Sequence, residues 1–245
     1  MFDLSTVDWF IASFAALLVG ISKTGIPGAG TLAVPLLADV LPARSSTGAL
    51  LPMLIFGDIF AVAYWRRHAV WPHLIRLMPW ALVGVVLGYF ALGFVNDRQL
   101  RPIIGAIVLI LLAVNFWRNR RGEPQEIPAS WYFAAVMGLL AGTTTMMANA
   151  AGPIMIVYLL AMRLPKNEFI GTGAWYFLIV NSIKVPFSAH LGLITAASLK
   201  FNLTLAPIIA IGALAGIVLV KTIPQKVFST IVQLLAALAA LKLLV

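Results

Sequence analysis

The chain of 245 residues is 62% hydrophobic and 10% charged, with a mean hydropathy of +1.00. Soluble domains carry roughly 25% charged residues, so this composition excludes an ordinary soluble domain and predicts an integral membrane protein. The formal net charge of +9 is typical of a membrane protein with basic loops. The sequence has no basic stripe that would favour nucleic-acid binding. The absence of Cys excludes disulfides and thiolate metal sites.

Apolar runs of a length suited to membrane helices follow one another along the chain, with short polar gaps between them. In the first half they span residues 9–22, 29–43, 47–65, 74–95 and 102–117. In the second half they span residues 130–162, 168–191, 203–220 and 227–245. The charged stretch between the halves contains two Pro and is predicted to be a surface loop. We therefore predict a first membrane repeat (1–120), a cytoplasmic linker (121–130) and a second membrane repeat (131–245).

The first pair of runs is interrupted by the sequence GISKTGIPGAGTLAVP at residues 20–35. Pro27 lacks an N–H and the surrounding glycines favour non-helical backbone, so the helix is predicted to break here. A second copy, GTTTMMANAAG at residues 142–152, aligns with the first at an offset of 122 residues. Irregular backbone at bilayer depth needs enclosing protein or a watery cavity, and paired interruptions in two halves indicate the binding site of a transporter.

The duplication extends beyond the interruptions. The aligned positions include Asp58 with Asn181, Gly84 with Gly212, and Gly88 with Gly216. Glycines four residues apart let helix backbones approach closely, so we predict that both GxxxG pairs pack within the bundle; a homodimer built on them is the alternative. Because Asp58 and Asn181 occupy equivalent positions, we expect them to lie near a pseudo-twofold axis and close to each other.

The distribution of basic residues selects the orientation of the repeats. If each interrupted segment turns back as a hairpin, ten Lys and Arg lie in cytoplasmic loops and five lie outside; if each crosses once, the numbers are eight and seven. Since cytoplasmic loops carry an excess of Lys and Arg, the hairpin arrangement is favoured. The predicted fold is all-α: a polytopic membrane protein with two inverted repeats, each a broken helical hairpin plus three transmembrane helices. Four tryptophans at the ends of runs are expected to be membrane-interface anchors: Trp65, Trp71, Trp117 and Trp131.

Three ionisable residues fall inside the apolar segments: Lys23 in the first interruption, and Asp58 and Lys184 in later helices. A charged side chain at bilayer depth costs at least about 2.5 to 3.5 kcal/mol, so each of the three is a functional candidate. Asp58 either pairs with a lysine to hold helices together or carries a proton coupled to transport. A lysine left unpaired by Asp58 would present positive charge to an anion.

The interruptions supply further groups suited to an anion. Half-helices beginning near Gly30 and Gly152 would direct free N–H groups and positive dipole ends to the midplane. Nearby hydroxyl and amide side chains suit a small oxyanion, although Thr in a membrane helix also bonds to its own backbone. Asn181 and Lys184, three residues apart, share one helix face. The predicted substrate-binding residues are Lys23, Thr24, Gly28, Gly30, Thr31, Thr143, Thr144, Thr145, Asn149, Gly152, Asn181 and Lys184.

Four stretches carry a family resemblance: GIPGAG at residues 25–30, TGA at 47–49, YWRRHAVWPHL at 64–74, and AGTTTMMANAAGPIMIVYLLAMRLPKNEFIGTGAWYFLIVNSIKVPF at 141–187. In these stretches the chain resembles the sulfite exporter TauE/SafE family, also called toluene sulfonate uptake permeases. The resemblance extends over nearly the whole chain. It implies a secondary transporter that moves sulfite, organosulfonates or related anions across the bacterial inner membrane, with proton coupling.

We therefore predict a transporter that exports a small sulfur-containing anion by alternating access at a midplane site, with the anion and the lipid bilayer as its partners. Two alternatives stay open: a passive anion channel of the same fold, and an uptake permease for another small organic anion. An enzyme is disfavoured because the chain has neither a Cys nor an HExxH motif, and no cofactor or metal is expected.

Overall fold

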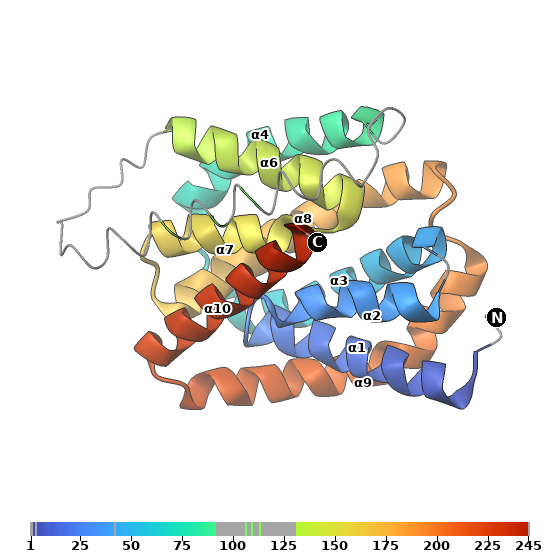
Figure 1. Ribbon diagram of the computed structural model, residues 1–245. Helices are drawn as coiled ribbons and strands as arrows, with labels where there is room; N and C mark the ends of the chain where they lie inside the picture. Colours follow the sequence, from blue (N-terminus) through green and yellow to red (C-terminus); the bar gives the residue numbers. More distant parts are fainter. Residues whose placement is uncertain are drawn as a thin grey trace. The chain divides into compact units, whose positions relative to one another are not determined.

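The computed structural model describes residues 4–41, 43–91 and 131–244, together with residues 2, 106, 109 and 113 (Figure 1). In these ranges every regular element is a helix, which confirms the predicted all-α class. The first half contains α1 (Thr6–Thr24), the short 3₁₀ helix η1 (Ala29–Leu32), α2 (Ala33–Val40), α3 (Ala43–Trp65), the 3₁₀ helix η2 (Arg66–His68) and α4 (Trp71–Ala91). The second half contains α6 (Trp131–Ala148), α7 (Ala151–Ala161), α8 (Lys166–His190), α9 (Ala196–Thr222) and α10 (Gln225–Leu244). The predicted run 102–117, with Trp117, and the linker 121–130 lie outside the described residues.

Four of the described helical segments are long and apolar enough to cross a membrane: α1, α4, α9 and the segment from Gly48 to His68. The apolar stretches of α6, α7 and α10 are shorter. α8 is also long, but it carries more polar residues, including Asn181 and Lys184. The chain is therefore a polytopic helical membrane protein, as its composition predicts.

Packing divides the chain into two compact units. Unit 1 comprises Met1–Ala69 and Ile170–Pro224, and unit 2 comprises Val70–Phe169 and Gln225–Val245. The first turn of α8 falls in unit 2 and the remainder in unit 1. Each unit thus combines helices from both halves of the sequence.

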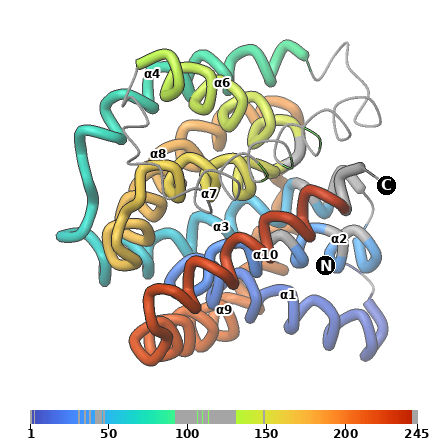
Figure 2. Tube along the Cα trace, turned by 60° about the vertical axis from the view of Figure 1, so that its left-hand side comes forward, coloured from blue at the N-terminus to red at the C-terminus, as the bar shows by residue number. Residues whose placement is uncertain are grey.

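Unit 1 is built on the close packing of α1 along α9, which lie side by side in both views (Figure 2). The close approach depends on glycine, because a Cβ on Gly20 would collide with the Ile209 carbonyl, and one on Gly212 with the Leu17 carbonyl. Apolar side chains of α1, α2, α3 and α9 form the core of this unit, among them Ala12, Ala16, Ala33, Leu37, Met53, Leu205 and Ile209.

Unit 2 contains the corresponding pair, α4 packed along α6. A Cβ on Gly84 would collide with the Leu139 carbonyl, and one on Gly142 with the Ala81 carbonyl. These contacts match those of unit 1 position by position, at the offsets of 122 and 128 residues that relate the two halves of the sequence. The predicted packing role of the GxxxG glycines is confirmed, since both pairs face a helix of their own unit.

Both predicted helix interruptions are present. α1 ends at Thr24, and the chain passes through Gly28, which has a φ of 102°, before η1 begins. α6 ends at Ala148, and Asn149 adopts a φ of 52° before α7 begins. Such left-handed backbone cannot continue a helix, and Gly and Asn are the residues that tolerate it best.

The second interruption is shorter than the sequence predicts, because α6 continues through Thr143, Thr144 and Thr145. No proline precedes Pro153 in this stretch, so nothing removes a helical N–H donor before Asn149. Pro153 itself lies in the first turn of α7, where a backbone N–H would have no helical acceptor.

Candidate functional site

A cluster of charged and amide side chains lies inside unit 1, where three helices meet. Lys23 comes from the last turn of α1, Asp58 from α3, and Asn181 and Lys184 from α8. We call these four residues the polar cluster. The Lys23 Nζ lies 2.8 Å from Asp58 Oδ1, and Asn181 Nδ2 donates a hydrogen bond of 2.8 Å to Asp58 Oδ2. The predicted closeness of Asp58 and Asn181 is confirmed.

The local sequence explains how Lys23 reaches Asp58. Gly57 precedes Asp58, and a Cβ there would lie 3.0 Å from the Lys23 Cγ, so the missing side chain leaves room for the lysine stem over α3. The Lys23 ammonium also lies 4.3 Å from the centroid of the Phe177 ring. A cation over an aromatic face is attracted by the ring quadrupole, which helps to hold the ammonium beside α8.

Lys184 is buried, with only 1% of its surface exposed. It interacts electrostatically with both Lys23 and Asp58. Phe177, Asn181 and Lys184 follow one another at intervals of four and three residues, which places them on one face of α8. Two lysines and one aspartate give the polar cluster a formal charge of +1 when all three are ionised. Removing a charge from water is costly, so a buried excess of positive charge suggests a function.

The orientation of the Asn181 amide follows from its partner. An ionised carboxylate only accepts hydrogen bonds, so Asn181 must turn its NH₂ group to Asp58 and its Oδ1 away. Asn181 is 1% exposed, and no donor among the described residues bonds to its Oδ1. An unsatisfied buried acceptor costs about 1–3 kcal/mol, so this oxygen is ready to accept a hydrogen bond from a ligand.

Thr24 uses its hydroxyl within the protein. Its hydroxyl oxygen lies 2.6 Å from Ala213 O and 3.2 Å from Gly20 O, so its single proton is donated to these backbone carbonyls. The Thr24 carbonyl, near the end of α1, accepts a 2.9 Å hydrogen bond from the Trp65 indole. Trp65 is 3% exposed, so its predicted role as a membrane-interface anchor is wrong. The indole instead satisfies a carbonyl that the helix interruption leaves without a helical donor.

The remaining predicted residues of unit 1 shape the first interruption. Gly28 provides the left-handed turn described above, and Gly30 lies in η1, where a Cβ would lie 2.9 Å from the Ser22 hydroxyl oxygen. Thr31 also lies in η1. Their predicted contact with substrate stays a prediction.

Five predicted residues belong to unit 2, around the second interruption. The hydroxyls of Thr143 and Thr144 donate to carbonyls of their own helix, at 2.9 Å from Leu139 O and 3.2 Å from Ala141 O. The backbone carbonyl of Thr145 accepts a hydrogen bond of 3.1 Å from the N–H of Asn149. Gly152 is the second residue of α7, close to the predicted start of that half-helix. Substrate contacts of these residues likewise stay predictions.

Comparison with known proteins identifies the family. A family model described as sulfite exporter TauE/SafE matches residues 12–243, a range that includes both interruptions and the polar cluster. No curated protein and no solved structure matches the chain. The family match extends over nearly the whole length and agrees with the resemblance of the sequence motifs. The chain is therefore a multi-pass membrane protein of the sulfite exporter TauE/SafE family, a family of membrane transporters.

Proposed function

We propose that this protein is a secondary transporter that exports a small sulfur-containing anion, sulfite or an organosulfonate, across the bacterial inner membrane. Membership of the TauE/SafE family supports a sulfite-like anion as the substrate. The observation that carries the proposal is the polar cluster, which places the buried Lys184 and Asp58 together with the largely enclosed Lys23 beside a helix interruption. A monoanion would neutralise the formal excess charge of this cluster.

The Asn181 Oδ1 atom, which has no hydrogen-bond donor among the described residues, would favour some anionic substrates over others. A ligand bound at the cluster would place its anionic group near the lysines and could donate an O–H or N–H to Asn181 Oδ1. Hydrogen sulfite, hydroxysulfonates and aminosulfonates carry such a donor, whereas sulfate and simple alkylsulfonates do not. We therefore propose that donor-bearing anions are preferred.

Asp58 is the proposed site of proton coupling. It is completely buried and bound to Lys23, so taking up a proton would weaken the ion pair and raise the charge of the polar cluster by one. An added positive charge favours anion binding, and its loss favours anion release. Proton and anion would thereby move in the same direction in an alternating-access cycle, and the outward gradient of the anion would drive its export.

Transport into proteoliposomes tests the proposal. Lys184→Met keeps the length of the side chain but removes its charge, so we expect sulfite transport to fall at least about tenfold, the equivalent of one lost charge-assisted contact. Asp58→Asn should abolish accumulation driven by a proton gradient while leaving downhill anion movement. The matched control is Lys200→Met, which removes a charge from an exposed position of unit 1.

The same assay separates the alternatives. Anion movement that never responds to a proton gradient in the unmodified protein would identify a passive channel. Unchanged transport in Lys184→Met would remove Lys184 from the site and contradict the proposal. Transport of a non-sulfur organic anion in preference to sulfite and sulfonates would identify a permease for another substrate.

A further inference from the structure

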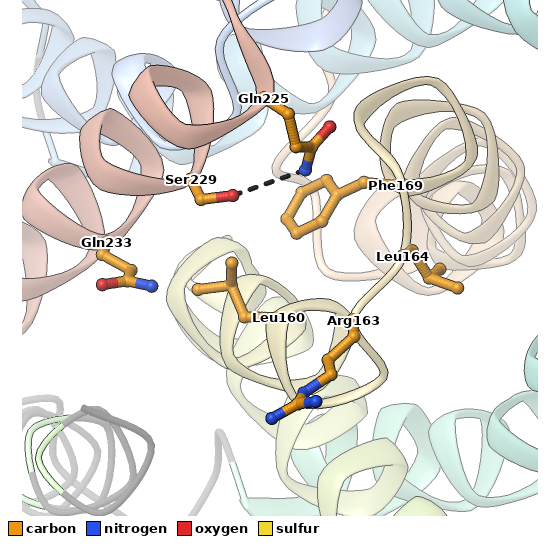
Figure 3. Close-up of a pocket in the computed structure, with 7 residues that line it drawn as sticks. All are labelled: Leu160, Arg163, Leu164, Phe169, Gln225, Ser229 and Gln233. Carbon is orange, nitrogen blue, oxygen red and sulfur yellow. Dashed lines mark hydrogen bonds between the residues drawn. The ribbon is translucent and has the colours of Figure 1, made fainter. Parts of the chain in front are cut away.

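Unit 2 contains a cavity of about 190 Å³ that has no part in the polar cluster. It lies between the end of α7, the first turn of α8 and the beginning of α10 (Figure 3). One side is polar and comes from α10, while Arg163, in the turn that follows α7, lines another side. Leu160 and Phe169 lie between them and provide an apolar wall.

The polar side of the cavity is a stripe along α10. Gln225, Ser229 and Gln233 recur every four residues, so they lie on one face of a helix that is otherwise largely apolar. Polar side chains in such a helix are unfavourable against lipid, and these three line the cavity. Their placement indicates a site for a polar ligand.

Hydrogen bonds within the protein orient this stripe. The backbone N–H of Lys166 donates a 2.8 Å bond to Gln225 Oε1, which turns the Gln225 Nε2 to the Ser229 hydroxyl at 3.4 Å. Ser229 accepts that bond, so its own proton is available to a ligand. The amide NH₂ of Gln233 forms no hydrogen bond within the described part of the chain. The stripe therefore offers donors to the cavity.

Arg163 adds the only formal charge among the residues that line this cavity. It has a φ of 53°, in the left-handed region, where the chain turns from α7 towards α8. Its side chain is exposed, and in the described ranges no carboxylate forms an ion pair with it. A guanidinium presents five N–H donors in a planar fork that matches the oxygens of phosphate.

We propose that this cavity binds a single phosphate-type oxyanion, either the headgroup of an anionic phospholipid or a free anion. The donors of Ser229 and Gln233 would bind the oxygens from one side and the Arg163 guanidinium from another. A volume of about 190 Å³ has room for roughly six water molecules at about 30 Å³ each, enough for one phosphate group. The apolar wall of Leu160 and Phe169 would contact the carbon part of a lipid ligand. This site does not depend on the proposed transport function.

Ligand-dependent thermal unfolding of the purified full-length protein in detergent tests this site. The probes are short-chain phosphatidylglycerol, phosphatidylcholine of the same chain length, and inorganic phosphate. A ligand that binds the folded state raises the unfolding midpoint, and the rise grows with the logarithm of the ligand concentration relative to Kd. We expect phosphatidylglycerol or phosphate to raise the midpoint and phosphatidylcholine to leave it unchanged.

Variants show whether the effect arises in the cavity. Arg163→Gln should weaken binding at least about tenfold through the loss of a charge-assisted contact, and Gln233→Leu should weaken it severalfold. The matched control is Lys226→Gln, which removes a charge from the beginning of α10. Lys226 does not line the cavity, so the Kd of this variant should stay within about twofold of the unmodified protein's. Lys226 is exposed, so this substitution should not disturb the fold.

The probes also identify the source of the oxyanion. Protection by phosphatidylglycerol alone would identify a lipid, and protection by phosphate alone would identify a free anion; both outcomes support the site. Equal protection by phosphatidylcholine, no protection by any probe, or equal losses in Arg163→Gln and Lys226→Gln would overturn the proposal.

Discussion

At the scale of single residues, the orientation of one amide has consequences for substrate choice. Asp58 is bound by Lys23 through one oxygen and by Asn181 through the other. This arrangement leaves Asn181 Oδ1 buried and without a donor, whereas the hydroxyl proton of Thr24 is already donated to backbone carbonyls. Within the described part of unit 1, the polar cluster therefore combines positive charge with a free acceptor, which suits an anion that also carries a donor.

The residue-scale prediction compares two ligands that differ by one hydroxyl group, isethionate and ethanesulfonate. The unmodified protein should bind isethionate about tenfold more tightly, because only isethionate can donate to Asn181 Oδ1. Asn181→Leu should remove this preference, and competition against sulfite binding measures it. Lys200→Met, which alters an exposed residue, is the control. Equal affinities for the two ligands in the unmodified protein would show that the Asn181 oxygen does not contact substrate.

At the scale of elements, the two closest helix pairs are built alike. α1 packs on α9 in unit 1 and α4 packs on α6 in unit 2, and glycines at equivalent positions permit both contacts. A Cβ on Gly216 would lie 2.8 Å from the Ile21 carbonyl oxygen, and a Cβ on Gly88 would lie 2.8 Å from the Thr143 carbonyl oxygen. Backbone atoms cannot move aside as a flexible side chain can, so added volume must separate the helices.

The element-scale prediction is that Gly88→Leu and Gly216→Leu each destabilise the protein by more than about 3 kcal/mol, since overpacking against backbone exceeds the usual cost of an added core group. Thermal unfolding in detergent measures the effect. The control is Val218→Leu on α9, where the side chain is 64% exposed and added volume meets no neighbour. If either glycine variant unfolded at the same midpoint as the control variant, the close helix packing at that glycine would be contradicted.

At the scale of the whole molecule, orientation across the membrane decides whether the repeats are inverted. The absence of Cys makes single introduced cysteines unambiguous reporters. In the inverted arrangement Lys200 lies outside and Lys226 in the cytoplasm, whereas parallel repeats would reverse both positions. We expect Lys200→Cys to react with a membrane-impermeant maleimide in intact spheroplasts and Lys226→Cys to react only after permeabilisation. Arg67→Cys, cytoplasmic in both arrangements, controls for leakage.

Several features were determined by the sequence alone. Hydropathy identified the described helices, and glycine and proline identified the first interruption. The alignment of the halves predicted the second interruption and the closeness of Asp58 and Asn181. These properties are local or follow from duplication: apolar length sets where helices run, and the alignment of the halves identifies equivalent positions. The packing of the GxxxG glycines was predictable for the same reason, because a missing side chain permits close backbone contact wherever two helices meet.

The tertiary structure decided which polar groups have partners within the protein. Trp65 was predicted at the membrane surface from its place at a helix end, yet its indole is buried against the Thr24 carbonyl. The hydroxyl of Thr24 was predicted to face an anion, yet it is bound to a carbonyl 189 residues away in the chain. The cavity beside Arg163 requires residues of α7, α8 and α10 to come together. Hydrogen bonding depends on atoms that only packing brings within about 3 Å, and no periodicity along the chain encodes that distance.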